Sequence, residues 1–306
     1  MTTLQIETCQ PLVQLQDGGR HGVRHLGITE GGALDWVAQY WANWMLGNAL
    51  DACALEIPLG GLSLRCVSDG TLALAGADLD AQLDDQPFAP WQSALLRAGQ
   101  TLRLRQPRQG SRAYLAVPGG FLCRHTLGSA ATVSREGLGG IDGLASPLRA
   151  GDLLQAAAGH GSLRTVPEAR RPSYTDSPVL DLVLGAQAGH FSGQSLFDAF
   201  NSDWQLDVRA DRMGMRLLGP ELQYLGPPMV SEGIPLGAVQ VPADGQPIIL
   251  LNDRQTIGGY PRLGAIAPHS LARLAQCAPG QTIRLHPCEH GGALRQHLQL
   301  LEQWKT

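Results

Sequence analysis

The residues best suited to chemistry lie between Ser231 and Tyr260, where apolar runs alternate with glycine, proline and polar side chains. Ala238–Val241 and Ile248–Leu251 have the composition and length of two strands, and a Gly258–Gly259 bend follows them. Glycine lets backbone N–H groups approach a ligand closely, while paired strands fix the geometry. The stretch therefore predicts either a ligand-binding rim or a hairpin that ends in an ordinary exposed turn. Its candidate contact residues are Glu232, Gln240, Thr256 and Tyr260.

A second candidate is the arginine segment QDGGRHGVRHLG, which runs from Gln16 to Gly27. Arginine grips a carboxylate or phosphate through two parallel hydrogen bonds, so Arg20 could hold an anion. The same side chain could instead tie down its own loop by donating to backbone carbonyl groups or to Asp17. The residues leave these two roles equally open.

The arginine segment has a counterpart in the second half of the chain. GRHGVRHLG at 19–27 and DRMGMRLLG at 211–219 share Arg, Gly, Arg, Leu and Gly without a gap. AGQTLRLR at 98–105 and PGQTIRLH at 279–286 match in the same order. Two matches in register indicate that the halves are related copies, each a β unit of similar plan. Arg212 then corresponds to Arg20, and a structural role is the favoured interpretation for it.

The composition describes a globular protein of 306 residues, 43% hydrophobic and 16% charged, which is long enough for two domains. The net charge of −4 argues against nucleic acid or an anionic membrane as partner, since both bind basic surfaces. No apolar run approaches the roughly 20 residues that span a bilayer, and the N-terminus lacks the pattern of a signal peptide. We therefore expect a cytoplasmic protein that acts on a small molecule.

Several catalytic classes lack the residues they need. The only lysine is Lys305, which leaves no P-loop lysine, Schiff-base lysine or internal biotin attachment site. The six cysteines form no C-x-x-C pair, and no G-x-S-x-G nucleophile elbow occurs. The histidine pairs His21/His25 and His286/His290 are interrupted by glycine and proline, so neither predicts helical display of metal ligands. We predict no bound metal and no covalent biotin on this chain.

Short strands are the main elements that must position these residues. After the arginine segment the sequence predicts a helix, with Asp35 placed to cap its start and Gly47 to end it. Asn43 lies off the apolar stripe of this helix, so its side chain faces either solvent or a site. From Cys53 to Gly151 strand-like runs and turn signals then alternate, which favours a β-sandwich or barrel over alternating βα units.

The second half is expected to repeat this plan after a proline-rich, charged segment at 163–178. A closing helix is predicted from about Gly292 to Trp304, with an apolar face that includes Leu294 and Leu298. The predicted fold is mainly β, with a few short helices and two β-barrel domains, at residues 1–165 and 176–306.

Taken together, the motifs resemble a known family. They are QDGGRHGVRHLG, GGALD, ANWMLGN, Glu56, RAYLAVPGG, the GSAAT loop, DRMGMRL and SEG…GAVQVPADGQP…DRQTIGGY. Over about residues 11–286 they are similar to the carboxyltransferase-like family that includes allophanate hydrolase subunit 2, and within it most similar to the C-type subunit of bacterial 5-oxoprolinase. The resemblance implies that both β-barrels are cyclophilin-like. In one departure, GSAAT stands at 128–132 where the family usually has GSRST, which weakens an anion-binding role for this loop.

The resemblance also implies membership of a complex. Beside a related B-type subunit and a LamB/YcsF-type A subunit, the chain would belong to an ATP-dependent 5-oxoprolinase, which opens the lactam ring of pyroglutamate to give glutamate. ATP, with or without magnesium, would be held by the complex. Two alternatives stay open: a carboxyltransferase-type subunit of a biotin-dependent urea or amide carboxylase, and a non-enzymatic antagonist of a histidine-kinase inhibitor. The sequence does not decide among the three, nor whether this chain contacts ATP.

Opening a lactam with ATP requires donors for phosphate and for the substrate carboxylate, and an acid that manages protons. We therefore expect Arg20 to hold an anion, and Asn43, Gln240, Thr256 and Tyr260 to position the substrate. Asp35 or Glu232 would be the proton-handling acid, although Asp35 is also the expected helix cap. On this hypothesis the substitution Arg20→Ala abolishes activity of the complex and spares the fold.

Overall fold

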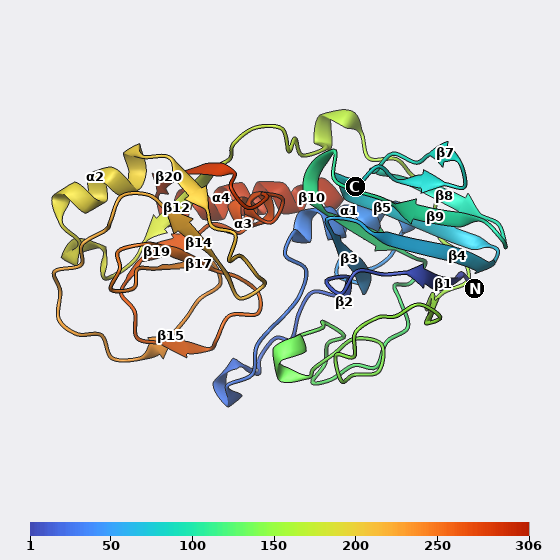
Figure 1. Ribbon diagram of the computed structural model, residues 1–306, viewed down its shortest axis with the longest axis horizontal. Coiled ribbons are helices and arrows are strands. Elements are labelled where there is room, and N and C mark those ends of the chain that lie inside the picture. The colour runs from blue at the N-terminus through green and yellow to red at the C-terminus, as the bar shows by residue number, and fades with distance from the viewer. Residues whose placement is uncertain (306) are drawn as a thin grey trace. The chain divides into compact units, whose positions relative to one another are not determined.

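The computed structural model describes residues 1–305 and is mainly β, with α-helices of 7 to 12 residues (Figure 1). The chain divides into two compact units. Unit 1 consists of Met1–His21 and Glu30–Thr175, and unit 2 consists of Gly22–Thr29 together with the chain from Asp176 onward. The predicted boundaries place the short segment Gly22–Thr29 in the N-terminal domain, whereas in the structure it belongs to unit 2.

Unit 1 is built from two antiparallel sheets, in the strand orders β11-β1-β4-β9-β6-β7 and β2-β3-β10-β5-β8. The pairing leaves both sheets open at their edges, so unit 1 differs from the closed barrel that the sequence led us to expect. The strands are β1 Thr3–Thr8, β2 Gln14–Gln16, β3 Ala54–Pro58, β4 Leu62–Ser68, β5 Gly70–Asp78, β6 Gln82–Leu83, β7 Gln86–Pro87, β8 Gln92–Leu96, β9 Thr101–Leu104, β10 Gln109–Ala116 and β11 Leu153–Gln155.

Alternating apolar residues of these strands form the core of unit 1. Leu4 and Ile6 on β1 are buried with Leu64 on β4, and Leu74 on β5 with Leu115 on β10. Burial of each such side chain contributes about 1.5–3 kcal/mol, so the two sheets are held mainly by this shared apolar layer.

The helix α1, Trp36–Leu46, packs on β5 and β10 and confirms the predicted helix and both of its ends. The Asp35 Oδ1 atom accepts a hydrogen bond of 3.0 Å from the backbone N–H of Ala38, which satisfies an amide that has no partner inside the helix. Gly47 ends the helix in the left-handed conformation, with φ of 75°.

Unit 2 contains a closed barrel in the order β12-β19-β16-β17-β14-β13-β20, in which a parallel β12–β20 pair completes the circle. A separate two-stranded ribbon pairs β15 with β18. The bounds are β12 Val179–Leu184, β13 Trp204–Leu206, β14 Gly214–Leu218, β15 Glu232–Gly233, β16 Ala238–Gln240, β17 Ile248–Leu250, β18 Ile257–Gly258, β19 Arg262–Ile266 and β20 Thr282–Cys288, with helices α2 Gly193–Asn201, α3 Pro268–Leu274 and α4 His290–Leu301.

The closing helix α4 differs from its prediction in what it buries. Leu294 and Leu298, predicted to lie on its apolar face, are 47% and 51% exposed, whereas Trp304 of the same predicted face is buried, as is Ala293. The helix lies against α3 and β12, and Leu294 and Leu298 remain at the surface of unit 2.

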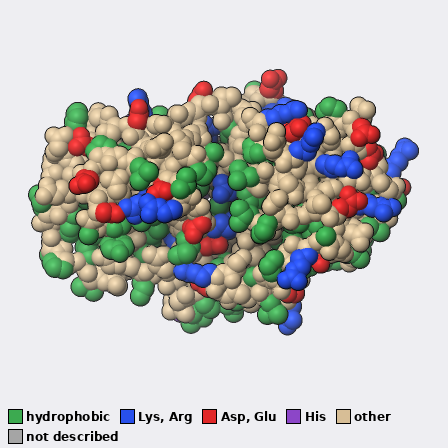
Figure 2. All heavy atoms as spheres, in the orientation of Figure 1, with side chains coloured by type: hydrophobic (Ala, Val, Ile, Leu, Met, Phe, Trp, Pro, Cys, Tyr) green, Lys and Arg blue, Asp and Glu red, His purple; other side chains and the backbone are tan. Residues whose placement is uncertain are grey.

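Figure 2 shows basic and acidic side chains interspersed over the visible face, without a continuous basic patch. Within residues 1–305, no helix is long and apolar enough to cross a membrane.

Candidate functional site

The predicted hairpin and rim form part of unit 2. Strands β16 and β17 pair antiparallel, with Val239 opposite Ile249, which confirms the two strands expected there. The chain then continues to β18, which pairs with β15 so that Gly258 lies opposite Glu232. The residues between Ser231 and Tyr260 therefore form two connected ribbons beside the barrel.

Two arginines fix this rim through its backbone. The Arg24 Nη2 atom donates to the carbonyl oxygens of Ile234, at 2.6 Å, and Thr256, at 3.2 Å. The Arg254 Nε atom donates to the same Ile234 oxygen at 3.2 Å. Charged donors make the stronger class of hydrogen bond, so the rim is held in place before any ligand arrives. No local pattern around Arg24 indicates that it holds a loop more than 200 residues away along the chain.

A polar cluster lies at the base of the rim. The Glu232 Oε1 atom accepts hydrogen bonds from Arg262 Nη2, at 2.6 Å, and from Gln187 Nε2, at 2.8 Å. The Arg262 Nη1 atom also donates to the Gly233 carbonyl oxygen at 2.8 Å. The Arg262 side chain is 17% exposed and that of Glu232 is 41% exposed, so the pair faces solvent on the carboxylate side.

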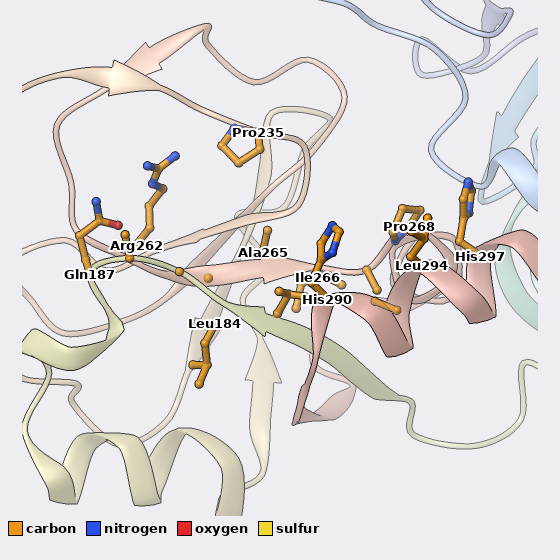
Figure 3. A pocket seen from close by; sticks show the side chains of 16 residues that line it. Leu184, Gln187, Pro235, Arg262, Ala265, Ile266, Pro268, His290, Leu294 and His297 are labelled. Atoms are coloured by element: carbon orange, nitrogen blue, oxygen red, sulfur yellow. The ribbon is translucent and has the colours of Figure 1, made fainter.

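This cluster borders a cavity of about 430 Å³, a size typical of small-molecule sites. Gln187 and Arg262 form its polar end, and Figure 3 shows both side chains pointing to the same side as Pro235. The floor consists of small and aliphatic residues of β12 and β19 and the loop after β12. At the other end α4 contributes His290 and His297 (Figure 3).

Close packing of the strands requires glycine in the cavity floor. A Cβ atom on Gly264 would lie 2.1 Å from the Val183 carbonyl oxygen, which no side chain can occupy. Gly185 faces the same position, since a Cβ atom there would lie 3.3 Å from the Gly264 Cα atom. The floor is therefore low and flat between the polar end and α4.

Two glutamine amides near the cluster each have a buried atom without a partner among residues 1–305. These atoms are Gln187 Oε1 and Gln240 Nε2. The Gln240 side chain is 2% exposed and lies behind the rim, where a Cβ atom on Gly258 would come within 3.1 Å of Nε2. A buried polar atom without a hydrogen bond costs about 1–3 kcal/mol, so such atoms are expected where function requires them.

At the histidine end of the cavity, His297 is held in its neutral form. Burial, reinforced by the nearby His269, lowers the pKa of His297 below its ordinary value. His269 itself bonds to Asp181, with 3.0 Å between Nε2 and Oδ2. Burial raises the pKa of Asp181, but the hydrogen bonds from His286 and His269 outweigh it and hold that pKa low. At neutral pH, His297 therefore presents an uncharged imidazole to the cavity.

The candidate anion-holding residue of unit 1 has structural partners. The Arg20 side chain is 0% exposed, and its guanidinium donates to the carbonyl oxygens of Thr126, Ser129 and Ala131. A fully buried guanidinium that bonds to three carbonyl oxygens of one loop holds that loop in place. Of the two roles that the sequence left open, this geometry favours loop-tying over anion-holding.

Asn43 and Asp35 are likewise committed within unit 1. The Asn43 Nδ2 atom donates to the carbonyl oxygens of Leu50 and Ala52, and its Oδ1 accepts from Asn48, so the fully buried amide closes the loop after α1. Asp35 caps α1 and accepts a hydrogen bond of 3.2 Å from the Tyr174 hydroxyl. Both placements favour structural roles over contact with a substrate.

The remaining candidates divide between the two ribbons of unit 2. Glu232 belongs to the polar cluster, and Gln240 lies behind it. Thr256 contributes its carbonyl oxygen to the rim. Tyr260 is 52% exposed and lines a separate cavity of about 710 Å³ with Tyr224. The structure therefore brings Glu232 and Gln240 to one place and leaves Tyr260 outside it.

Sequence reasoning missed Gln187 and Arg262. Gln187 stands in an alanine- and glycine-rich loop after β12, and Arg262 follows the rim that was singled out. The pairing of Gln240 with Arg262 across β16 and β19 could not be read without knowing that these strands are neighbours. Within residues 1–305, no group of three or more His, Cys, Asp or Glu side chains could hold a metal ion.

Comparisons with known proteins place the chain among carboxyltransferase domains. Residues 26–287 match the family model described as carboxyltransferase domain, subdomain A and B. The C-type subunit of the 5-oxoprolinase of Escherichia coli (strain K12) is 40% identical over 271 residues, which covers 86% of this chain and 84% of that protein. A putative urea carboxylase of Emericella nidulans is 32% identical over 266 residues, but they make up only 21% of that protein.

A solved structure shares the fold over almost the whole chain. The crystal structure of the K. lactis urea amidolyase matches with a TM-score of 0.92 and 24% identity, covering 99% of this chain. This chain corresponds to 20% of that protein, so the likeness concerns one part of a much longer polypeptide.

Proposed function

Because the chain belongs to the carboxyltransferase domain family of subdomains A and B, we propose that it is the C-type subunit of an ATP-dependent 5-oxoprolinase. With A-type and B-type subunits, the latter related to this chain, it opens the lactam ring of pyroglutamate to glutamate in the cytoplasm. Ring opening adds water across the C–N bond: the carbonyl carbon takes the hydroxyl group and the ring nitrogen takes a proton. ATP drives the reaction and, by taking up a second water molecule, leaves as ADP and phosphate.

The observation that carries this proposal is the extent of the match to the C-type subunit of the E. coli 5-oxoprolinase. The aligned region covers most of both proteins, at 86% and 84%, and the identity of 40% exceeds that of the urea carboxylase match.

The unit 2 cavity and the glycine loop of unit 1 do not fit a nucleoside triphosphate. Arg262 is the cation of the unit 2 cavity, and Glu232 already accepts from its guanidinium. In the glycine loop of unit 1, the Ala130 N–H and the Ser129 hydroxyl bond to Asp17 at 2.6 Å each, so they cannot cradle phosphate. The proposal therefore assigns ATP to another part of the complex and derives no step of this chain through it.

Within this proposal, unit 2 holds the organic substrate. Glu232 is the candidate proton-handling acid, because its carboxylate is partly exposed beside the cavity and oriented by Gln187 and Arg262. A proton-transferring group must lie within hydrogen-bond reach of the reacting atom, and a carboxylate fixed by two donors meets this requirement for a ligand at the polar end. The proposal gives this role to Glu232 in preference to Asp35, whose carboxylate caps α1.

A second candidate function is carboxyl transfer to urea or a related amide. The match to the Emericella nidulans protein, named a putative urea carboxylase, favours it over the regulatory alternative. This chain has Lys305 as its only lysine, so a carboxylated biotin would have to arrive on another chain.

The test is release of glutamate from pyroglutamate with ATP, measured with this chain and its A-type and B-type partners together, and again with this chain omitted. Activity that requires all three chains supports the proposal. A folded complex that consumes ATP without releasing glutamate, and that carboxylates urea when a biotin carboxylase and carrier are added, supports the second candidate instead.

A further inference from the structure

The polar end of the unit 2 cavity pairs a hydrogen-bond acceptor with a donor. Gln187 Nε2 and Arg262 Nη2 both bond to the same Glu232 oxygen, at 2.8 and 2.6 Å, so the two side chains lie next to each other. The bond to Glu232 also settles which way the Gln187 amide faces, because a reversed amide would set two oxygen atoms against each other. The amide oxygen Oε1 is thereby directed away from Glu232.

This oxygen is the strongest pointer to a ligand. Gln187 lines the cavity, and its Oε1 atom is buried without a donor within residues 1–305. A buried acceptor without a donor is unfavourable, and a ligand N–H group would supply the missing hydrogen bond in a place where water does not compete. Beside it, the guanidinium of Arg262 has five N–H groups, of which Glu232 and the Gly233 carbonyl take one each. The remaining donors suit a ligand carbonyl oxygen.

We propose that Gln187 and Arg262 together recognise the edge of an amide on which N–H and C=O point the same way. Ring amides and ureas have such an edge, because the ring or the second nitrogen places an N–H on the same side as the carbonyl oxygen. An open-chain secondary amide is trans and directs the two groups to opposite sides, so it cannot bond to both residues at once. The site therefore discriminates by amide geometry.

The rest of the cavity suits a compact ligand of this kind. Its floor is formed by Gly185, Ala186, Gly264 and Ala265, which leaves room for a flat ring against the strands. Glu232 acts as a positioning residue here, since it orients both recognition side chains. His297, uncharged at neutral pH, closes the far end and adds no charge. The identification of the ligand as a lactam rests on the proposed function, whereas recognition of the amide edge does not.

Binding to the complete chain tests the inference, by titration calorimetry or ligand-observed NMR with four compounds. Pyroglutamate and urea have the shared edge, N-methylacetamide has the trans geometry, and L-proline keeps the ring and carboxylate but lacks the carbonyl of the amide. We expect the preferred edge-bearing compound to bind roughly tenfold or more tightly than both controls, the change produced by one buried hydrogen bond.

The variant Gln187→Met keeps the length of the side chain and removes the amide, and it should erase this preference. Arg262→Lys keeps the charge but loses the paired donors, and should weaken edge-bearing compounds more than L-proline. Gln194→Leu alters an exposed glutamine of α2 and serves as the matched control, with binding unchanged. Equal binding of N-methylacetamide, or an unchanged preference in Gln187→Met, overturns the inference.

The same variants in the three-chain complex separate this inference from the proposed function. Glutamate release that continues with an unchanged KM in Gln187→Met overturns the recognition site and leaves the 5-oxoprolinase proposal standing. Edge-selective binding by a complex that never opens the ring supports the site and overturns the 5-oxoprolinase proposal. Tighter binding of urea than of pyroglutamate supports the recognition site and favours the second candidate function, carboxyl transfer to urea or a related amide.

Discussion

Removing the Arg20 side chain should make unit 1 easier to unfold, rather than remove a ligand contact. Its guanidinium donates to the carbonyl oxygens of Ala131 at 2.8 Å, Thr126 at 2.9 Å and Ser129 at 3.4 Å, and the side chain is 0% exposed. Hydrogen bonds from a charged donor contribute about 1.5–3 kcal/mol each, and the two short ones are the strongest. Arg20→Ala also leaves the carbonyl oxygens buried without this donor.

The expected loss is therefore about 3–5 kcal/mol of unfolding free energy, a large part of the 5–15 kcal/mol typical of a domain. At roughly 2–4 °C per kcal/mol for a unit of this size, Tm falls by about 10 °C. Arg20→Lys keeps one cationic nitrogen and should lose less. Arg97→Ala, at an exposed arginine of the same unit, is the matched control and should leave stability unchanged.

Urea unfolding followed by circular dichroism measures these differences. The result that would refute the reasoning is an Arg20→Ala protein of wild-type stability whose complex no longer releases glutamate. That outcome would restore the anion-holding role expected from the sequence. A destabilised Arg20→Ala protein whose complex remains active at low temperature would establish the loop-tying role.

Three further predictions concern α1, α4 and the thiols. Asp35→Ala should cost about 0.5–2 kcal/mol through loss of the helix cap, and Asp35→Asn less, as measured by urea midpoints. Burial, with the charge of His269, lowers the pKa of His297 in the folded state, so below about pH 6.5 the unfolded chain binds a proton that the folded chain does not. Stability should then fall with pH below that value, and His297→Asn should flatten the profile. The hydrogen bond with Cys123 and burial raise the pKa of Cys53 well above its usual value, so iodoacetamide at about pH 8 should label Cys53 only after unfolding, as seen by mass spectrometry.

Local signals predicted the local elements. Asp35 and Gly47 mark the ends of α1 because capping and the left-handed C-terminal turn depend on neighbours within the helix. Alternating apolar residues and flanking turn residues predict strands at Val179–Leu184 and Thr101–Leu104, and these ranges coincide with β12 and β9. The family and the mainly β fold with a closed barrel are confirmed.

The site depended on contacts that no local pattern records. Arg20 and Arg212 occupy matching positions in the repeat, yet Arg20 binds carbonyl groups of a loop and Arg212 forms an ion pair of 3.1 Å with Asp253. The repeat determines the positions of the two arginines in the sequence, whereas the surrounding loops determine which groups each side chain contacts. Gln187 was missed for the same reason, because its partner Glu232 is 45 residues away along the chain.

A buried polar atom without a partner points to a ligand only where its side chain lines a cavity, and Gln187 in unit 2 meets both conditions. In unit 1, Glu56 accepts from the Tyr114 hydroxyl at 2.6 Å and from the Leu34 amide at 2.9 Å, and Asn43 has partners for both ends of its amide. Such a network stabilises a core and leaves little for a substrate. In unit 2, Gln187 lines a cavity with an apolar floor and keeps an atom without a partner among residues 1–305, as does Gln240 behind the rim. Folding alone does not favour that arrangement, because each such atom is unfavourable until a donor or acceptor reaches it. A ligand bound by Gln187 and Arg262 would offset the free energy lost by leaving Gln187 Oε1 without a hydrogen bond. Gln187 and Arg262 are therefore the first residues to substitute.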